Sequence, residues 1–130
     1  MEKIKKLKNK LKKYNLDGYL IPKNDEYFSE YVPLQRDYLQ YISNFSGSYG
    51  LALILKKDNF LFVDGRYTVQ ANIQSGRNFE VLTLPINKNK KILKLKNKRI
   101  GFDPKLFTEP FIEQFSKKLE SKCIAINNNL

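Results

Sequence analysis

The sequence predicts an α/β domain, in which a mixed sheet of about six strands is flanked by helices on both faces. Helical and strand-like patterns alternate along the chain, in an order that interleaves four helices with six strands. The expected strands are short apolar runs bounded by Gly, Pro, Asp or Asn, whereas the expected helices place apolar residues three or four positions apart. With 130 residues, 42% of them hydrophobic, the chain has the size of one domain and enough apolar surface for a core.

In the first half of the chain, the opening helix places Ile, Leu and Tyr at helical spacing, and its lysines fall outside that stripe. An Asn and an Asp-Gly pair are expected to end it. The apolar triplet that follows predicts a buried strand, because Pro22 comes directly after it. A polar and aromatic loop then leads to a second helix and to two strands joined by a loop of hairpin length. The expected elements are helices at 2–14 and 35–44 and strands at 19–21, 51–55 and 60–63.

In the second half, an Asp-Gly pair opens a helix that Gly76 is expected to end. Two apolar runs follow as strands, separated by a basic connection at 86–98. Thr108 is the expected N-cap of the last helix, since Glu109 and Pro110 suit a first helical turn. The expected elements are helices at 66–75 and 108–119 and strands at 79–84, 99–102 and 123–126.

The formal charge of +11 is concentrated in two short segments. Residues 1–15 carry a net charge of +6 and residues 86–100 carry +7. One interpretation is a surface for nucleic acid or anionic lipid; the other is a solvated helix face and a solvated loop. Neither segment interleaves aromatic residues with its lysines, as a base-stacking surface would. We therefore expect no specific nucleic acid and no membrane as partners.

The chain has no His and one Cys, which excludes several kinds of site. A Ser-His-Asp triad, a Cys-His pair and an imidazole metal site all need His. An internal disulfide needs two cysteines, so a reducing compartment, the cytoplasm, is expected. The longest apolar run, Leu51–Leu55, is far shorter than a membrane span of about 20 residues. No catalytic residue and no metal ligand is expected in this chain.

Three segments of polar, small and aromatic residues lie at or beyond the ends of predicted strands, at 22–31, 41–50 and 62–71. Ligands in α/β sheets are bound at such places. In the third segment, Gly65 is expected to adopt a backbone conformation closed to other residues. Arg66 lies near a helix start, where the helix dipole gives a cation no support. Either an internal pair with Asp64 or a bound ligand would explain its position.

Taken together, these segments resemble the N-terminal domain of cytosolic Xaa-Pro aminopeptidases, of the creatinase/prolidase superfamily. The resemblance covers residues 4–130, and the motifs agree in order and spacing. The matching segments are Asp25–Tyr31, Asp37–Gly50, Phe62–Ala71 and Ile100–Pro104. Four residues depart from the family pattern: Tyr27 replaces His, Asn44 replaces Gly, Tyr49 replaces Ala and Phe62 replaces Trp.

The resemblance implies a domain that does not itself carry out catalysis. In the family, two divalent metal ions, usually manganese, lie in a C-terminal domain and activate the hydroxide that attacks the bond before proline. The chain is accordingly expected to be a single domain, 1–130, at the start of a longer peptidase. Its expected partners are that catalytic domain, a second copy in a homodimer and a proline-containing peptide. The alternatives are a prolidase or creatinase relative and a stand-alone basic binding module.

The resemblance also implies roles for particular residues. Arg66 is expected to contact the bound peptide, because a guanidinium offers a rigid fork of donors to carbonyls or a carboxylate. Tyr67 and Phe45 are assigned to the same substrate-binding site, with packing in the core as the alternative. The residues expected to shape the turns are Asp64, Gly65, Ser29, Glu30 and Tyr31.

Overall fold

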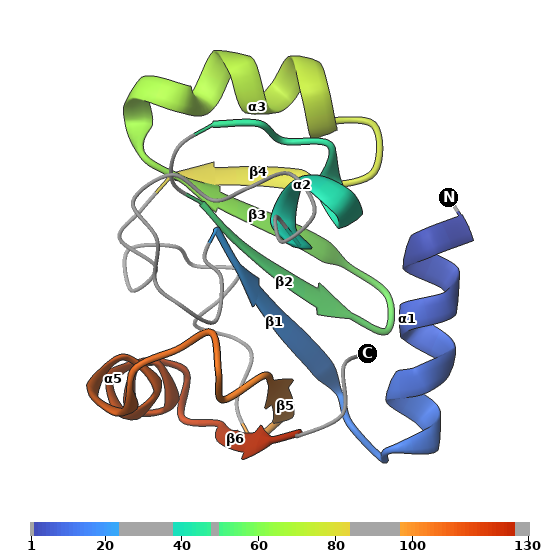
Figure 1. Cartoon of the computed structure of the whole chain (residues 1–130), viewed down its shortest axis with the longest axis vertical. Helices are drawn as coiled ribbons and strands as arrows, with labels where there is room; N and C mark the ends of the chain where they lie inside the picture. The colour runs from blue at the N-terminus through green and yellow to red at the C-terminus, as the bar shows by residue number, and fades with distance from the viewer. Residues whose placement is uncertain (1, 24–37, 48–49, 84–96, 127–130) are drawn as a thin grey trace.

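A computed structural model of the chain describes residues 2–23, 38–47, 50–83 and 97–126. Its centre is a six-stranded sheet with the order β4-β3-β2-β1-β5-β6 (Figure 1). The six strands and the helices on both faces confirm the predicted fold class. The strands are β1 (Gly18–Pro22), β2 (Leu51–Leu55), β3 (Asn59–Val63), β4 (Glu80–Thr83), β5 (Arg99–Phe102) and β6 (Lys122–Ala125). The helices are α1 (Glu2–Lys13), α2 (Tyr38–Ser43), the short 3₁₀ helix η2 (Gly65–Tyr67), α3 (Thr68–Ser75) and α5 (Glu109–Leu119).

All strands except β2 run in the same direction. β2 is antiparallel to both of its neighbours, β1 and β3, whereas β3 with β4, β1 with β5, and β5 with β6 form parallel pairs. The carboxyl ends of the five parallel strands therefore share one edge of the sheet. The turn that follows β3 lies at that edge, where sheets of this class bind ligands.

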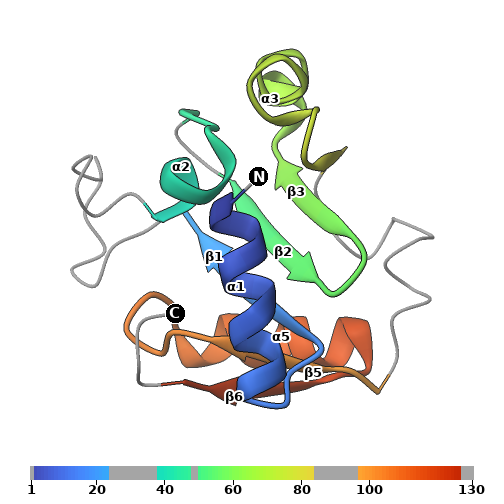
Figure 2. The same ribbon diagram turned by 90° about the vertical axis from the view of Figure 1, so that its right-hand side faces the viewer.

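The two faces of the sheet are covered by different helices (Figure 2). α1, α2 and α3 pack on one face, and α5 packs on the other. Alternate residues along a strand point to opposite faces, so β2 contributes Ala52 and Ile54 to the first face and Leu51, Leu53 and Leu55 to the second. This is why the central strands have continuous apolar sequences.

The connection from α1 to β1 closes with a left-handed residue. Asn15 has a φ of 56°, and the Leu16 N–H donates to the Leu11 carbonyl at 2.8 Å. This arrangement satisfies the last carbonyls of the helix, and both leucines are buried. The connection is also bonded to β5, because the Asp17 N–H donates to the Arg99 carbonyl at 2.8 Å and Asp17 Oδ2 accepts from the Arg99 N–H at 2.8 Å.

Several predicted boundaries are shifted. β1 includes Pro22, which is paired with Leu51 at the end of the strand. The third helix begins at Thr68 instead of residue 66, because the preceding residues form the 3₁₀ turn. Thr108 is the N-cap of α5, as expected, and its hydroxyl accepts from the Phe111 N–H at 3.4 Å. In the described part of the chain, no helix combines the length and the apolar character needed to cross a membrane.

Candidate functional site

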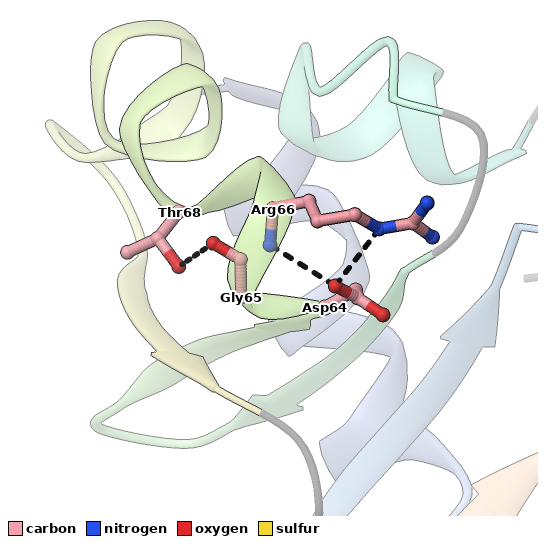
Figure 3. A network of polar contacts seen from close by, with 4 residues as sticks. All are labelled: Asp64, Gly65, Arg66 and Thr68. Atoms are coloured by element: carbon pink, nitrogen blue, oxygen red, sulfur yellow. Dashed lines mark hydrogen bonds and ion pairs between the residues drawn. The ribbon is translucent and has the colours of Figure 1, made fainter.

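The segment after β3 turns sharply through η2 before α3 begins (Figure 3). Asp64 caps this turn, since its Oδ1 accepts a hydrogen bond from the Arg66 backbone N–H at 3.0 Å. The Tyr67 N–H donates to the Asp64 carbonyl at 2.9 Å. The Thr68 hydroxyl donates to the Gly65 carbonyl at 3.1 Å. These bonds fix the direction in which the Arg66 side chain leaves the backbone.

Asp64 also holds the guanidinium of Arg66. Arg66 Nε donates to the same Oδ1 at 3.2 Å, and the two side chains are 78% and 45% exposed for Arg66 and Asp64 respectively. The hydrogen bonds from the Arg66 backbone and side chain, together with its charge, lower the pKa of the Asp64 carboxyl from its ordinary value. The two terminal nitrogens of Arg66 point away from the carboxylate (Figure 3). A fork of N–H donors is thus directed outward and matches a carbonyl or a carboxylate.

The expectation for the Gly65 backbone is wrong. No glycine in the described residues has a positive φ, so Gly65 does not use a conformation closed to other residues. A Cβ at this position would meet only Thr83 Cγ2, at 3.8 Å, an ordinary contact distance. The Asp64 cap accounts for the turn without any special backbone geometry, because a 3₁₀ turn uses ordinary helical angles.

Arg66, Tyr67 and Phe45 form a continuous series of contacts from the surface to the core. The Arg66 guanidinium lies 5.5 Å from the centre of the Tyr67 ring. Tyr67 in turn meets Phe45 edge to face, with the ring centres 6.2 Å apart. Phe45 is 0% exposed and belongs to the core beneath α1, α2 and α3. In the described structure, Phe45 therefore supports Tyr67 from below, whereas Arg66 is the residue at the surface.

The glycine turn after α2 lies directly over the Phe45 ring. A Cβ on Gly47 would come within 2.2 Å of Phe45 Cζ, and a Cβ on Gly50 would come within 3.0 Å of the same ring. Since real Cβ atoms essentially never come that close, a side chain at position 47 would require the buried ring to move. These glycines are needed for close approach and not for an unusual φ.

Hydrogen bonds connect the residues after α2 to α3. Gln74 Nε2 donates to Ser46 Oγ at 2.8 Å, and the Ser46 backbone N–H donates to Gln74 Oε1 at 3.0 Å. Gln70 Nε2 adds a bond to Ser46 Oγ at 3.2 Å. No expectation from the sequence includes this cluster, although Gln70 and Gln74 are spaced so that they share one face of a helix. The cluster fixes Phe45 relative to the helix that begins beside Arg66.

A buried pair of serines makes a second connection between the same elements. The Ser75 hydroxyl donates to the Ser43 carbonyl at 2.6 Å, and both residues are buried. The Ser43 hydroxyl donates to the Leu39 carbonyl at 2.6 Å and accepts from the Phe45 N–H at 3.2 Å. The segment at 41–50 is therefore joined to α3, the helix that begins within the segment at 62–71, both in the core and at the surface.

Asn44 accounts for one of the departures from the family pattern. Its φ is 66°, in the left-handed region that glycine adopts most readily and asparagine next. The position at which the resemblance leads us to expect Gly thus has a backbone conformation that Asn tolerates. The replacement preserves the turn that leads into Phe45.

The expected turn residues Ser29, Glu30 and Tyr31 lie outside the described residues. Within the described ranges, no three His, Cys, Asp or Glu side chains gather where they could hold a metal ion. The candidate site therefore consists of Arg66 at the surface and the half-buried Tyr67 beside it, with Asp64, Phe45 and the Ser46 cluster as their support.

Comparison with known proteins agrees with the arrangement of these motifs. The model of the creatinase/prolidase N-terminal domain family matches residues 3–128. The Xaa-Pro aminopeptidase 1 of Dictyostelium discoideum is 29% identical over 131 residues, which cover 96% of this chain but 21% of that protein. The chain thus spans about a fifth of the length of the curated relatives it matches.

Solved structures share the fold. The X-prolyl aminopeptidase of Caenorhabditis elegans, described as a cytosolic enzyme with a di-nuclear active site, superposes with a TM-score of 0.82 at 24% identity. The match covers 98% of this chain and 24% of that enzyme. The N-terminal domain of the cytoplasmic peptidase PepQ from Mycobacterium tuberculosis, crystallised without the rest of its chain, has a TM-score of 0.72 at 23% identity. That match covers 95% of this chain and 91% of the other, so the same fold forms as an isolated domain.

Proposed function

The chain belongs to the creatinase/prolidase N-terminal domain family, and on that premise we propose that it is the non-catalytic first domain of a longer Xaa-Pro aminopeptidase. Residues 1–130 form this single domain in the proposal. The peptidase removes the N-terminal residue that precedes proline, and this domain forms one wall of the substrate cleft. The names of the relatives and their greater length support this proposal.

The reaction itself belongs to another part of the peptidase. The described residues do not fit a di-metal centre, because no three potential ligands gather and the sequence has no His. In the proposal, two divalent metal ions, manganese by family resemblance, are held in the catalytic domain. The full-length enzyme is a homodimer in the cytoplasm, and the description of the similar C. elegans enzyme as cytosolic supports this compartment.

The observation that carries the proposal is the geometry of Arg66. Asp64 engages Nε, and this leaves the two terminal nitrogens directed outward from a rigid turn. A guanidinium fixed in this way binds a peptide carbonyl or carboxylate without first losing much conformational freedom. We assign Arg66 the role of positioning the substrate, with Tyr67 beside it.

The test is replacement of Arg66 in the full-length gene product. For R66A, kcat/KM on an X-Pro peptide is expected to fall about 10- to 100-fold, because one charge-assisted hydrogen-bonding group is lost. R66K is expected to retain part of the activity, since it keeps the charge but loses the fork. The matched control is K5A, which removes one exposed charge from α1. A wild-type value of kcat/KM in a folded R66A enzyme would exclude this role.

A further inference from the structure

Lysine is distributed very unevenly along the chain. Of the 20 lysines, 18 lie in residues 1–23 and 88–130, and the 64 residues between contain only Lys56 and Lys57. Lysine is strongly hydrated and is depleted in protein interfaces relative to the remaining surface. The Lys-poor part of the sequence includes α2, β2, β3, α3 and β4, which adjoin one another in the fold (Figure 1).

The outer faces of α1 and α3 show the contrast directly. Both helices cover the same face of the sheet. The outer side of α1 exposes Lys5, Lys6, Lys10, Lys12 and Lys13. α3 buries Ala71 and Ser75, and on its outer side it exposes Val69 and Ile73, at 73% and 80%. The solvent-facing side of α1 is thus charged, whereas that of α3 carries two large aliphatic side chains one turn apart.

Two of the four arginines flank this aliphatic pair. Arg66 lies in the turn before α3, and the exposed Arg77 lies two residues after its end. Arginine is enriched in interfaces, in contrast to lysine. The outer face of α3 thus combines exposed apolar residues with flanking arginines, and the helix has no lysine. This composition is typical of a surface that another protein domain covers. In Figures 1 and 2, α3 stands at one end of the molecule, away from α5.

We propose that the outer face of α3, defined by Val69 and Ile73, is the surface against which the catalytic domain of the peptidase packs. This inference rests on the proposed function. Ile73 is seven residues from Arg66, a rise of about 10 Å along a helix. In the proposed function, Arg66 contacts a peptide bound in the catalytic domain. Because Val69 and Ile73 follow Arg66 within two helical turns, they lie close to the same domain. The relatives, of which this chain spans about a fifth, supply a covering domain in the same polypeptide.

Tyr41 provides the matched control. It is also a large exposed residue in the Lys-poor part of the chain, at 61% exposure. It lies on α2 and is engaged within the domain, because Lys3 Nζ lies 4.1 Å from the centre of its ring and donates to its carbonyl at 3.1 Å. Because Tyr41 already has contacts within this domain, we do not expect the catalytic domain to cover it, and position 41 serves as an exposed reference.

The experiment compares thiol labelling in the 130-residue chain and in the full-length gene product. Cys123, the single cysteine of this 130-residue chain, is first replaced by C123S, and I73C or Y41C is then introduced. Labelling is read at the introduced cysteine by peptide mapping, so that thiols elsewhere in the full-length protein do not contribute. In the 130-residue chain, a bulky maleimide is expected to label both variants at similar rates. In the full-length protein, I73C is expected to react at least about tenfold more slowly, with Y41C unchanged. Adding V69S to I73C is expected to restore much of the rate, because it weakens the packing at the neighbouring position.

The labelling rates distinguish the catalytic domain from a second copy as the domain that covers α3. Equal labelling of I73C in both proteins overturns the inference, and if the full-length protein still cleaves an X-Pro peptide the proposed function is unaffected. Protection of I73C that disappears on dilution identifies a second copy as the covering partner, which also overturns the inference. Protection that persists in the full-length protein when it is shown to be monomeric by analytical ultracentrifugation supports packing within one polypeptide. If that protein cleaves no X-Pro peptide, the packing surface stands while the proposed function fails.

Discussion

The ring of Phe45 meets the ring of Tyr67 edge to face, with centres 6.2 Å apart and planes inclined at 77°. One ring is fully buried, and the other belongs to the turn that carries Arg66. The position of the surface arginine therefore depends on core packing.

Gly47 is expected to tolerate no side chain. The free energy of unfolding should fall by about 1–3 kcal/mol in G47A, because the new Cβ would lie 2.2 Å from Phe45 Cζ and the buried ring must shift. Urea unfolding of the 130-residue chain measures the change. In an F45L background, where the ring is absent, the same substitution should cost at least about 1 kcal/mol less. The control is G65A, which should leave stability unchanged or raise it by up to about 1 kcal/mol. A G47A protein as stable as wild type would show that the ring is not beneath this glycine.

Asn44 is expected to be replaceable by glycine but not by alanine. Its φ of 66° costs a residue with a Cβ about 1–2 kcal/mol unless its side chain is suited to the left-handed region. N44A should therefore be less stable than N44G by about 1 kcal/mol, as measured by chemical denaturation. Equal stabilities would mean that the turn before Phe45 adopts an ordinary backbone conformation in solution.

The two connections between the α2 turn and α3 are expected to differ in strength. S75A removes the donor of a buried hydrogen bond, leaves the Ser43 carbonyl without it, and should cost about 1–3 kcal/mol. Q74A removes bonds at the surface, where water can replace the lost partner, and should cost about 1 kcal/mol or less. Thermal unfolding of both variants gives the comparison. A larger loss in Q74A would place the main connection at the surface instead of in the core.

The contribution of Asp64 is expected to depend on pH. The hydrogen bonds and charge of Arg66 lower the pKa of its carboxyl in the folded protein, so folding favours the ionised form. The stabilisation is complete above the pKa of the unfolded chain, about 4, and is lost as the pH falls through the lower pKa of the folded state. Urea unfolding of wild type and D64N should therefore differ more at pH 7 than at pH 2. A difference that does not change with pH would exclude ionisation of Asp64 as its source.

Sequence reasoning predicted the sheet well because its strands carry strong local signals. β2 and β3 are apolar runs separated by a short polar loop, and Thr108 precedes a helix with favourable first-turn residues. The family resemblance rested on motifs whose spacing survives substitution, and the match to the family model confirms it. The predicted start of α3 was shifted because the 3₁₀ turn η2 precedes it, and a 3₁₀ turn and an α-helix have similar backbone angles.

The support of the candidate site was harder to predict. Gly47 and Gly50 belong to the segment singled out at 41–50, but nothing in the local sequence indicates that they admit the Phe45 ring. Ser46 and Gln74 are separated by 28 residues, and no local pattern indicates that they meet. The role of Gly65 was wrongly predicted, because glycine in a turn suggests a left-handed backbone that the Asp64 cap makes unnecessary.

The reciprocal bonds between Asp17 and Arg99 have a consequence for synthesis on the ribosome. They join residues 82 positions apart, and the adjoining β5 completes one side of β1. At about 5–20 residues per second, β1 waits about 4–16 s for that neighbour to be synthesised. Throughout this interval, the nascent chain presents one edge of an apolar strand with unpaired backbone groups, a site of association with other chains. Because β1 is synthesised long before its neighbour β5, we expect the nascent chain to benefit from a chaperone that covers the free edge of β1.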